Sequence, residues 1–271
     1  MYLYKYRSFN LNHIKALSNN EIWFSRGDFF NDPLDCTTDV PITLIDGKNY
    51  FQFAMKNTAV QYHLDQGNIS KQNIISILHE RLNEMQDIVE NSQEADHPLS
   101  LLESMMFNVL KRTFVCCFAG SATNHLMWSH YADAHTGFCV RFRKDKLISN
   151  ENIRRHGPVN YDGEPISIMS QLNRDKQSTH IFDEVVFQKS PEWSYEDEYR
   201  LTYNDYATSE NDNFRQMVYG NDVIDCIFFG LRTKESDIMF IKRLFEGRNV
   251  KFKRIKRERS GFKLFVDPED I

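Results

Sequence analysis

Six short apolar runs, separated by turn-rich pieces, constrain the fold of this chain more than any other feature. They are TFVCCFAG, GFCVRF, EVVFQK, EYRLTY, DCIFFG and KFKRIKR, and all of them follow Lys111. Short apolar runs that are rich in β-branched and aromatic residues favour strands. The sequence therefore predicts an antiparallel or mixed sheet.

The start of the chain predicts a strand, a helix and a second strand. Residues 2–9 alternate aromatic and polar positions, a period of two that is typical of a strand. Leu11, Ile14 and Leu17 follow at helical spacing and end at an Asn-Asn pair, after which EIWFS has the pattern of a short strand. We expect the central sheet to be built from both ends of the chain.

The stretch between these two regions has a helical pattern instead. ISKQNIISILHERLNEMQDIV places its apolar residues on one helical face, and SLLESMMFNVLKR predicts another helix. A chain of 271 residues is compatible with one compact unit that carries an insertion. We therefore expect a single α+β domain over residues 1–271, with a mixed or antiparallel central sheet and a helical insertion or lobe at about residues 50–112.

The composition narrows the class of protein. Hydrophobic residues make up 41% and aromatic residues 13% of the chain, which is enough for a packed core. The formal net charge of -5 lacks the basic excess of non-specific nucleic-acid binders. No apolar run approaches the roughly 20 residues that cross a bilayer, so we expect a cytoplasmic protein without a membrane partner. The five cysteines contain no C-x-x-C pair, which signals neither a disulfide nor a zinc site.

Three blocks combine aromatic with charged residues, and the first pairs YKYRSF with IWFSRGDFFNDPLD. Arg7 lies near the end of the first predicted strand and Ser25 near the end of the second. The planar arginine side chain suits phosphate or carboxylate. The structural alternative is an ion pair of Arg7 with Asp28, Asp32 or Asp35 that fixes the loop.

The second block is NHLMWSHYADAHTGFCVRF. Its three histidines, His125, His130 and His135, are spaced by five, which scatters them around a helix, so no metal site is expected. A short helix with Met127 and Trp128 in the core would leave His130 or Tyr131 toward a cleft. Histidine can serve there as an acid or base near neutral pH.

The third block, PEWSYEDEYRL, carries two closely spaced glutamates. If residues 196–201 form a strand, then Glu196, Glu198 and Arg200 share one face. Two carboxylates side by side raise the pKa of one of them or require a cation between them. The structural alternative is an ion pair of Glu198 with Arg200 or with Arg7.

Together, LYKYRSF, WFSRGDFFNDPLDC, MWSHYADAHTGFCVRF, EWSYEDEYRL and IFFGLRT resemble a bacterial family catalogued only as a domain of unknown function, number 2971. The motifs fall between Leu3 and Thr233, so the resemblance spans most of the chain. It implies no established activity. Members of that family are often met among mobile elements and phage-defence genes.

A more distant resemblance suggests chemistry. ADP-ribosyltransferase folds order their site as an Arg or His on the first strand, a Ser or Tyr motif on the next, and a late Glu, often in an E-x-E motif. Arg7, Ser25 and Glu196-x-Glu198 follow that order. The resemblance implies NAD as substrate, with a dinucleotide phosphate on Arg7 and Ser25 as a buttress. Glu198 would bind a ribose hydroxyl and stabilise an oxocarbenium-like transition state.

The neighbouring residues receive roles in the same scheme. Glu196 would orient or deprotonate the acceptor, and His130 is a candidate acid or base. Tyr131 is a candidate for contact with the cofactor. The side chains that would stack on nicotinamide are Tyr4, Tyr6, Trp23 or Phe24.

Three functional hypotheses follow. The first is an enzyme that transfers ADP-ribose from NAD to a protein or nucleic-acid acceptor, or hydrolyses NAD, as a toxin or phage-defence effector. The second is a metal-dependent nucleic-acid-processing protein, in which acidic residues of the first and third blocks hold a divalent cation. The third is a non-catalytic sensor of a ligand. The basic run KFKRIKR decides little, because such a pattern is typical of the solvent face of an edge strand.

Overall fold

The structure, a computed structural model, describes residues 1–36, 113–162, 185–204 and 213–271, with a few more between residues 64 and 80. The strands are β1 (Tyr2–Arg7), β2 (Glu21–Arg26), β3 (Thr113–Ala119), β4 (Phe138–Arg143), β5 (Arg155–Pro158), β6 (Glu198–Asn204), β7 (Phe214–Val218), β8 (Ile224–Phe229), β9 (Lys251–Arg257) and β10 (Leu264–Val266). The helices are α1 (Leu11–Ser18), η1 (Gly27–Phe29), α6 (His125–Tyr131), α7 (Lys144–Ile148), η4 (Pro191–Glu196) and α10 (Glu235–Leu244). Most of the insertion predicted at residues 50–112 lies outside the described residues.

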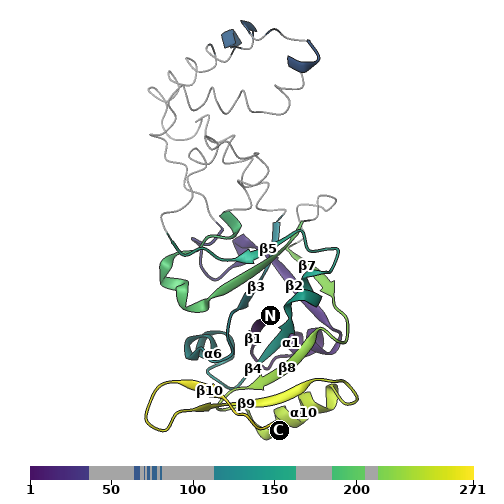
Figure 1. Cartoon of the computed structure of the whole chain (residues 1–271), viewed down its shortest axis with the longest axis vertical. Helices are drawn as coiled ribbons and strands as arrows, with labels where there is room; N and C mark the ends of the chain where they lie inside the picture. The colour runs from purple at the N-terminus through teal and green to yellow at the C-terminus, as the bar shows by residue number, and fades with distance from the viewer. Residues whose placement is uncertain are drawn as a thin grey trace.

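The described strands form one large mixed sheet, which confirms the α+β class (Figure 1). Its main path runs β10-β9-β8-β4-β1-β3-β2-β7, and β6 and β5 extend it from β3. Both chain ends contribute, because β1 lies between β4 and β3 while β8 to β10 come last in sequence. The predicted order of strand, helix and strand at the start of the chain is also confirmed.

The apolar runs become strands with one exception. Of EVVFQK, the described residues 185–189 form a helical turn followed by a single bridge, Asn160 to Gln188, so the expected strand is wrong there. Val185 and Val186 are buried all the same. The apolar pattern therefore predicts correctly that these residues are buried, but it does not predict their backbone conformation. Periodicity cannot distinguish a short buried turn from a buried strand.

The basic run KFKRIKR forms β9, and it is not an edge strand. It pairs in parallel with β8 on one side and antiparallel with β10 on the other. Parallel neighbours need a crossover connection, and α10 provides it between β8 and β9 at the C-terminal end of the molecule (Figure 1).

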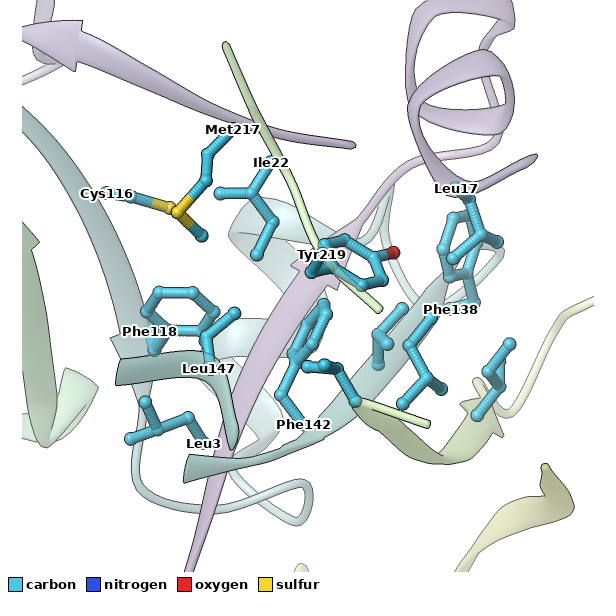
Figure 2. Packing of buried hydrophobic residues seen from close by; sticks show 14 of the residues in the cluster. Leu3, Leu17, Ile22, Cys116, Phe118, Phe138, Phe142, Leu147, Met217 and Tyr219 are labelled. Carbon is cyan, nitrogen blue, oxygen red and sulfur yellow. The ribbon is translucent and has the colours of Figure 1, made fainter. Parts of the chain in front are cut away.

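The sheet buries apolar side chains on both faces. Leu3, Phe118 and Phe142 belong to the larger cluster, against which α1, α7 and α10 pack through residues such as Leu17 and Leu147 (Figure 2). The opposite face holds a second cluster under α6. Trp128 of α6 is fully buried there, and its indole N–H donates to the Ala122 carbonyl at 2.7 Å. Met127 and Trp128 thus enter the core, as predicted.

None of the described helices is long and apolar enough to cross a membrane. All five cysteines are free.

Candidate functional site

The sheet forks at one edge of β3. One edge of β3 pairs with β6 along its whole length, and the other edge is shared by two strands. Val115 faces Ser25 of β2, whereas Ala119 faces Tyr4 of β1. Neither register provides a partner for the residues in between, Cys116–Phe118. The fork therefore leaves an opening in the sheet between β1 and β2.

A cavity of about 780 Å³ occupies this fork. Residues from both sheet faces line it, which is expected of an opening between diverging strands. Seven of the eight site residues predicted from the sequence line the cavity: Tyr6, Arg7, Ser25, Trp23, Tyr131, Glu196 and Glu198. The eighth, His130, is exposed on α6 beside the Tyr195 ring, 6.2 Å between centroids, and does not line it.

The acidic end of the cavity is a buried cluster of five charged side chains, contributed by Asp35, Lys189, Glu196, Glu198 and Arg200. The Arg200 guanidinium binds Asp35 with two hydrogen bonds of 2.9 and 2.7 Å, and it donates two more, of 2.8 and 3.3 Å, to Glu198 Oε2. Lys189 Nζ lies 2.6 Å from Glu196, 3.5 Å from Asp35 and 3.7 Å from Glu198. Two cations thus offset three carboxylates, as buried charges require.

Glu196 does not share a strand with Glu198, contrary to the sequence expectation. It ends the 3-10 helix η4, Asp197 takes a left-handed conformation with φ 46°, and β6 begins only at Glu198. The PEWSYE segment starts with Pro at N1 or N2, which favours a helical turn. The expected alternative ion pair of Glu198 with Arg200 is present, and Lys189 is the cation between the two glutamates.

The Tyr131 hydroxyl completes the contacts of Glu196. It donates to Glu196 Oε1 at 2.6 Å, while Lys189 holds Oε2. Asn31 donates in turn to the Tyr131 hydroxyl at 3.4 Å. Burial raises the pKa of Tyr131, and the bonded Glu196 raises it further, so the phenol stays a proton donor at neutral pH.

Glu198 remains ionised. Burial alone would raise the pKa of its carboxyl group, but Arg200 and Lys189 outweigh burial and hold the pKa below its ordinary value. The Cys117 thiol contributes in the same direction and also lowers the pKa of Glu198. Glu198 is therefore a fixed negative charge at the wall of the cavity.

Arg7 also lines the cavity, and it has no acidic partner among the described residues. The alternative ion pairs expected for it do not form, because Asp28 pairs with Arg26, Asp35 pairs with Arg200, and Asp32 accepts from the Leu34 backbone. Among the described residues no carboxylate contacts the Arg7 guanidinium. Burial lowers its pKa from the ordinary value, which means that folding desolvates this charge.

The loop after α6 fixes the backbone of Arg7. A Cβ atom at Gly137 would lie 2.1 Å from the Arg7 carbonyl oxygen, so only glycine permits this approach. Three successive residues, Asp133, Ala134 and His135, have positive φ values of 48°, 48° and 71° just before it. Left-handed backbone costs about 1–3 kcal/mol at each non-glycine position and persists only where the surrounding structure imposes it.

The predicted cofactor-binding residues differ in how accessible they are. Tyr6 is buried against Trp128, and its hydroxyl donates to the Ser121 carbonyl at 2.7 Å, so its ring belongs largely to the core. Trp23 is 45% exposed at the rim, with its indole N–H on Glu21 at 3.3 Å. Ser25 lines the cavity where β2 meets β3.

The described residues contain no group of three or more His, Cys, Asp or Glu side chains that could hold a metal ion. The metal hypothesis requires five carboxylates, and four of them are already bound by Lys189, Arg200 or Arg26. The fifth, Asp32, accepts a hydrogen bond from the Leu34 backbone.

Sequence reasoning missed two cations of the site, Lys5 and Lys189. The sequence did contain a signal for Lys189, because the crowded carboxylates around Glu198 require a counter-charge and Lys189 lies two residues before the PEWSYEDEYRL block. Lys5 gave no such signal, because alternation alone puts it on the same side of β1 as Leu3, a core residue.

Residues 127–201 match the model of a family described as "Protein of unknown function (DUF2971)". The matched stretch contains Tyr131, Lys189, Glu196, Glu198 and Arg200, most of the acidic end of the cavity. The search of curated proteins and the search of solved structures found no match.

Proposed function

We propose that the fork cavity binds NAD and that Glu198 promotes cleavage of the nicotinamide–ribose bond. The ADP-ribose would pass to a protein or nucleic-acid acceptor or to water. One observation carries this proposal: a single cavity is lined both by Arg7, a cation that no carboxylate contacts in the described part of the chain, and by Glu198, a carboxylate kept ionised. Its volume of about 780 Å³ lies within the ordinary range of small-molecule sites.

The charge of Glu198 suits this reaction. When the bond between C1′ and the pyridinium nitrogen breaks, its electron pair stays on nitrogen and nicotinamide leaves as a neutral molecule, so no acid is needed. Positive charge develops on the ribose ring instead. A fixed carboxylate beside it stabilises that charge without reorganisation.

The remaining step forms a bond from the acceptor oxygen to C1′. Glu196 is suited to orient that oxygen by accepting its hydrogen bond, and Tyr131 and Lys189 hold Glu196 in place for this role. The acceptor proton ends in solvent. With water as acceptor the products are ADP-ribose, nicotinamide and one proton.

The resemblance to ADP-ribosyltransferases rests on the order of Arg7, Ser25 and Glu198 in the sequence. A chain that consumed NAD or modified a cellular target would act as a toxin or phage-defence effector, which is the setting that the wider family resemblance suggests.

The test is to incubate the protein with NAD and identify the products by mass spectrometry. Free nicotinamide with free ADP-ribose identifies a hydrolase, and nicotinamide with an added mass of ADP-ribose on protein or nucleic acid identifies a transferase. Intact NAD, with and without cell extract, contradicts the proposal. NAD that binds but stays intact would favour a non-catalytic sensor.

A further inference from the structure

Lys5 lies in the fork where a strand would otherwise pair. Its ammonium donates to the Cys117 carbonyl at 2.6 Å, within the stretch of β3 that neither β1 nor β2 reaches. The same ammonium lies 5.1 Å from the centre of the Phe118 ring. Neither the Cys117 carbonyl nor the Phe118 ring carries a negative charge. In the described part of the chain, Lys5 therefore has no carboxylate partner.

Arg7 follows two positions later on the same side of β1. Residues i and i+2 of a strand lie about 7 Å apart, so the two cations stand near each other along one wall of the cavity. Burial lowers the pKa of Lys5, and the charge of Arg7 lowers it further. Two like charges thus lie near each other in a half-buried place, which costs free energy unless an anion joins them.

The two buried cations at the acidic end of the cavity differ in this respect. Lys189 is matched by Glu196, and Arg200 is matched by Asp35 and Glu198. Among the residues that the structure describes, Lys5 and Arg7 are therefore the cations of the site that lack a carboxylate partner.

We propose that Lys5 and Arg7 form a subsite for a diphosphate, so that the fork cavity selects nucleoside diphosphates and their derivatives over monophosphates. This inference rests on the ligand class of the proposed function and adds Lys5 to it as a binding residue. The guanidinium can bind two oxygens of one phosphate, and the ammonium can bind the next phosphate. A monophosphate satisfies only one of the two cations.

The experiment is calorimetric titration of the full-length protein with adenosine, AMP, ADP and inorganic pyrophosphate. We expect ADP to bind about tenfold tighter than AMP, the contribution of one charged hydrogen-bonded contact, and pyrophosphate to compete with ADP. Lys5→Met and Arg7→Met should each weaken ADP about tenfold and reduce its advantage over AMP. Lys242→Met and Arg243→Met, the same changes on the exposed face of α10, should bind ADP like the wild type.

Thermal unfolding without ligand separates a binding role from a structural one. Arg7→Met removes a cation that has no carboxylate partner among the described residues, so it should melt at the wild-type temperature or above it. Lys5→Met also loses the hydrogen bond to the Cys117 carbonyl, so Arg7→Met is the cleaner of the two variants. Equal affinities of the wild type for ADP and AMP, or loss of thermal stability in both variants, would overturn the proposal. If a variant does not fold, the affinities of the wild type for the four ligands still test whether the cavity prefers a diphosphate to a monophosphate.

The outcome is independent of turnover. Tight ADP binding that depends on Lys5 and Arg7, without NAD cleavage, would support the subsite and reject the proposed reaction. NAD cleavage with an unchanged KM in both variants would reject the subsite alone.

Discussion

Arg200 binds both carboxylate oxygens of Asp35, a residue 165 positions earlier in the chain, through parallel hydrogen bonds of 2.9 and 2.7 Å. The pair joins the loop after β2 to the interior strand β6. Arg200 is completely buried and also holds Glu198 and the Val186 carbonyl. One side chain therefore fixes the acidic end of the cavity from three separate segments.

Replacing Arg200 should destabilise the fold severely. Arg200→Met leaves Asp35 and Glu198 buried with less counter-charge, and breaking a buried ion pair from one side costs about 3–5 kcal/mol. Urea unfolding at neutral pH measures this loss. Arg232→Met, at an exposed position, is the matched control and should change the free energy of unfolding by less than about 0.5 kcal/mol. A small effect of Arg200→Met would mean that the buried cluster of charged side chains does not depend on Arg200 for its stability.

Lys189→Met should make stability depend on pH in the opposite sense to the wild type. In the wild type the pKa of Glu198 is lowered, so its contribution is present above the unfolded-state pKa and is lost as pH falls through the folded value. Without Lys189, the folded-state pKa of at least one buried carboxyl should exceed its unfolded value, and protonation then restores stability. The deficit of Lys189→Met should be largest at pH 7 and shrink toward pH 4 in urea titrations. A deficit independent of pH would show that Lys189 acts by packing alone.

Gly137→Ala should disturb Arg7 without touching its side chain. The new Cβ would lie 2.1 Å from the Arg7 carbonyl oxygen and 3.0 Å from that of Ala132. Overpacking of this kind costs about 1–3 kcal/mol, and the shift of β1 should weaken ADP binding as well. At Gly157 the added Cβ meets only the Phe187 ring at 3.6 Å, so Gly157→Ala should retain stability and binding. Equal effects of the two substitutions would contradict the assigned contact.

Substitutions at the neighbouring residues His130 and Tyr131 should differ in their effects on stability and on the rate of NAD cleavage. Tyr131→Phe removes the hydrogen bond to Glu196, a charged acceptor, and should cost about 1.5–3 kcal/mol of stability while lowering the rate of NAD cleavage. His130→Asn changes an exposed side chain outside the cavity and should alter neither quantity. Chemical denaturation and nicotinamide release provide the two readouts. A larger loss of rate at His130 than at Tyr131 would reverse this assignment.

Much of the site was predictable because its residues belong to elements with clear local patterns. Alternation in β1 and the EIWFS strand place Arg7, Trp23 and Ser25, and the charged PEWSYEDEYRL block attracts attention to Glu196 and Glu198. All five line one cavity. What these residues do there stays a prediction.

The geometry between the elements was not predictable from the same patterns. The fork exists because β1 and β2 pair with opposite ends of one β3 edge, a long-range choice with no local signature. For the same reason the sequence pattern does not distinguish Lys5 from an ordinary strand residue. Asp197 shows a local limit, since its left-handed backbone separates Glu196 from the strand that alternation had extended through it.

The most direct test of the account compares nicotinamide release by the wild type, Glu198→Gln and Arg7→Met over a range of NAD concentrations. Glu198→Gln should lower kcat about 100-fold or more with little change in KM, because it removes a charge needed in the transition state. Arg7→Met should raise KM instead. Circular dichroism must show that both variants remain folded. A lower kcat in Glu198→Gln together with a higher KM in Arg7→Met would show that both residues act on bound NAD. Equal rates in all three proteins, or no nicotinamide release by the wild type, would contradict the account.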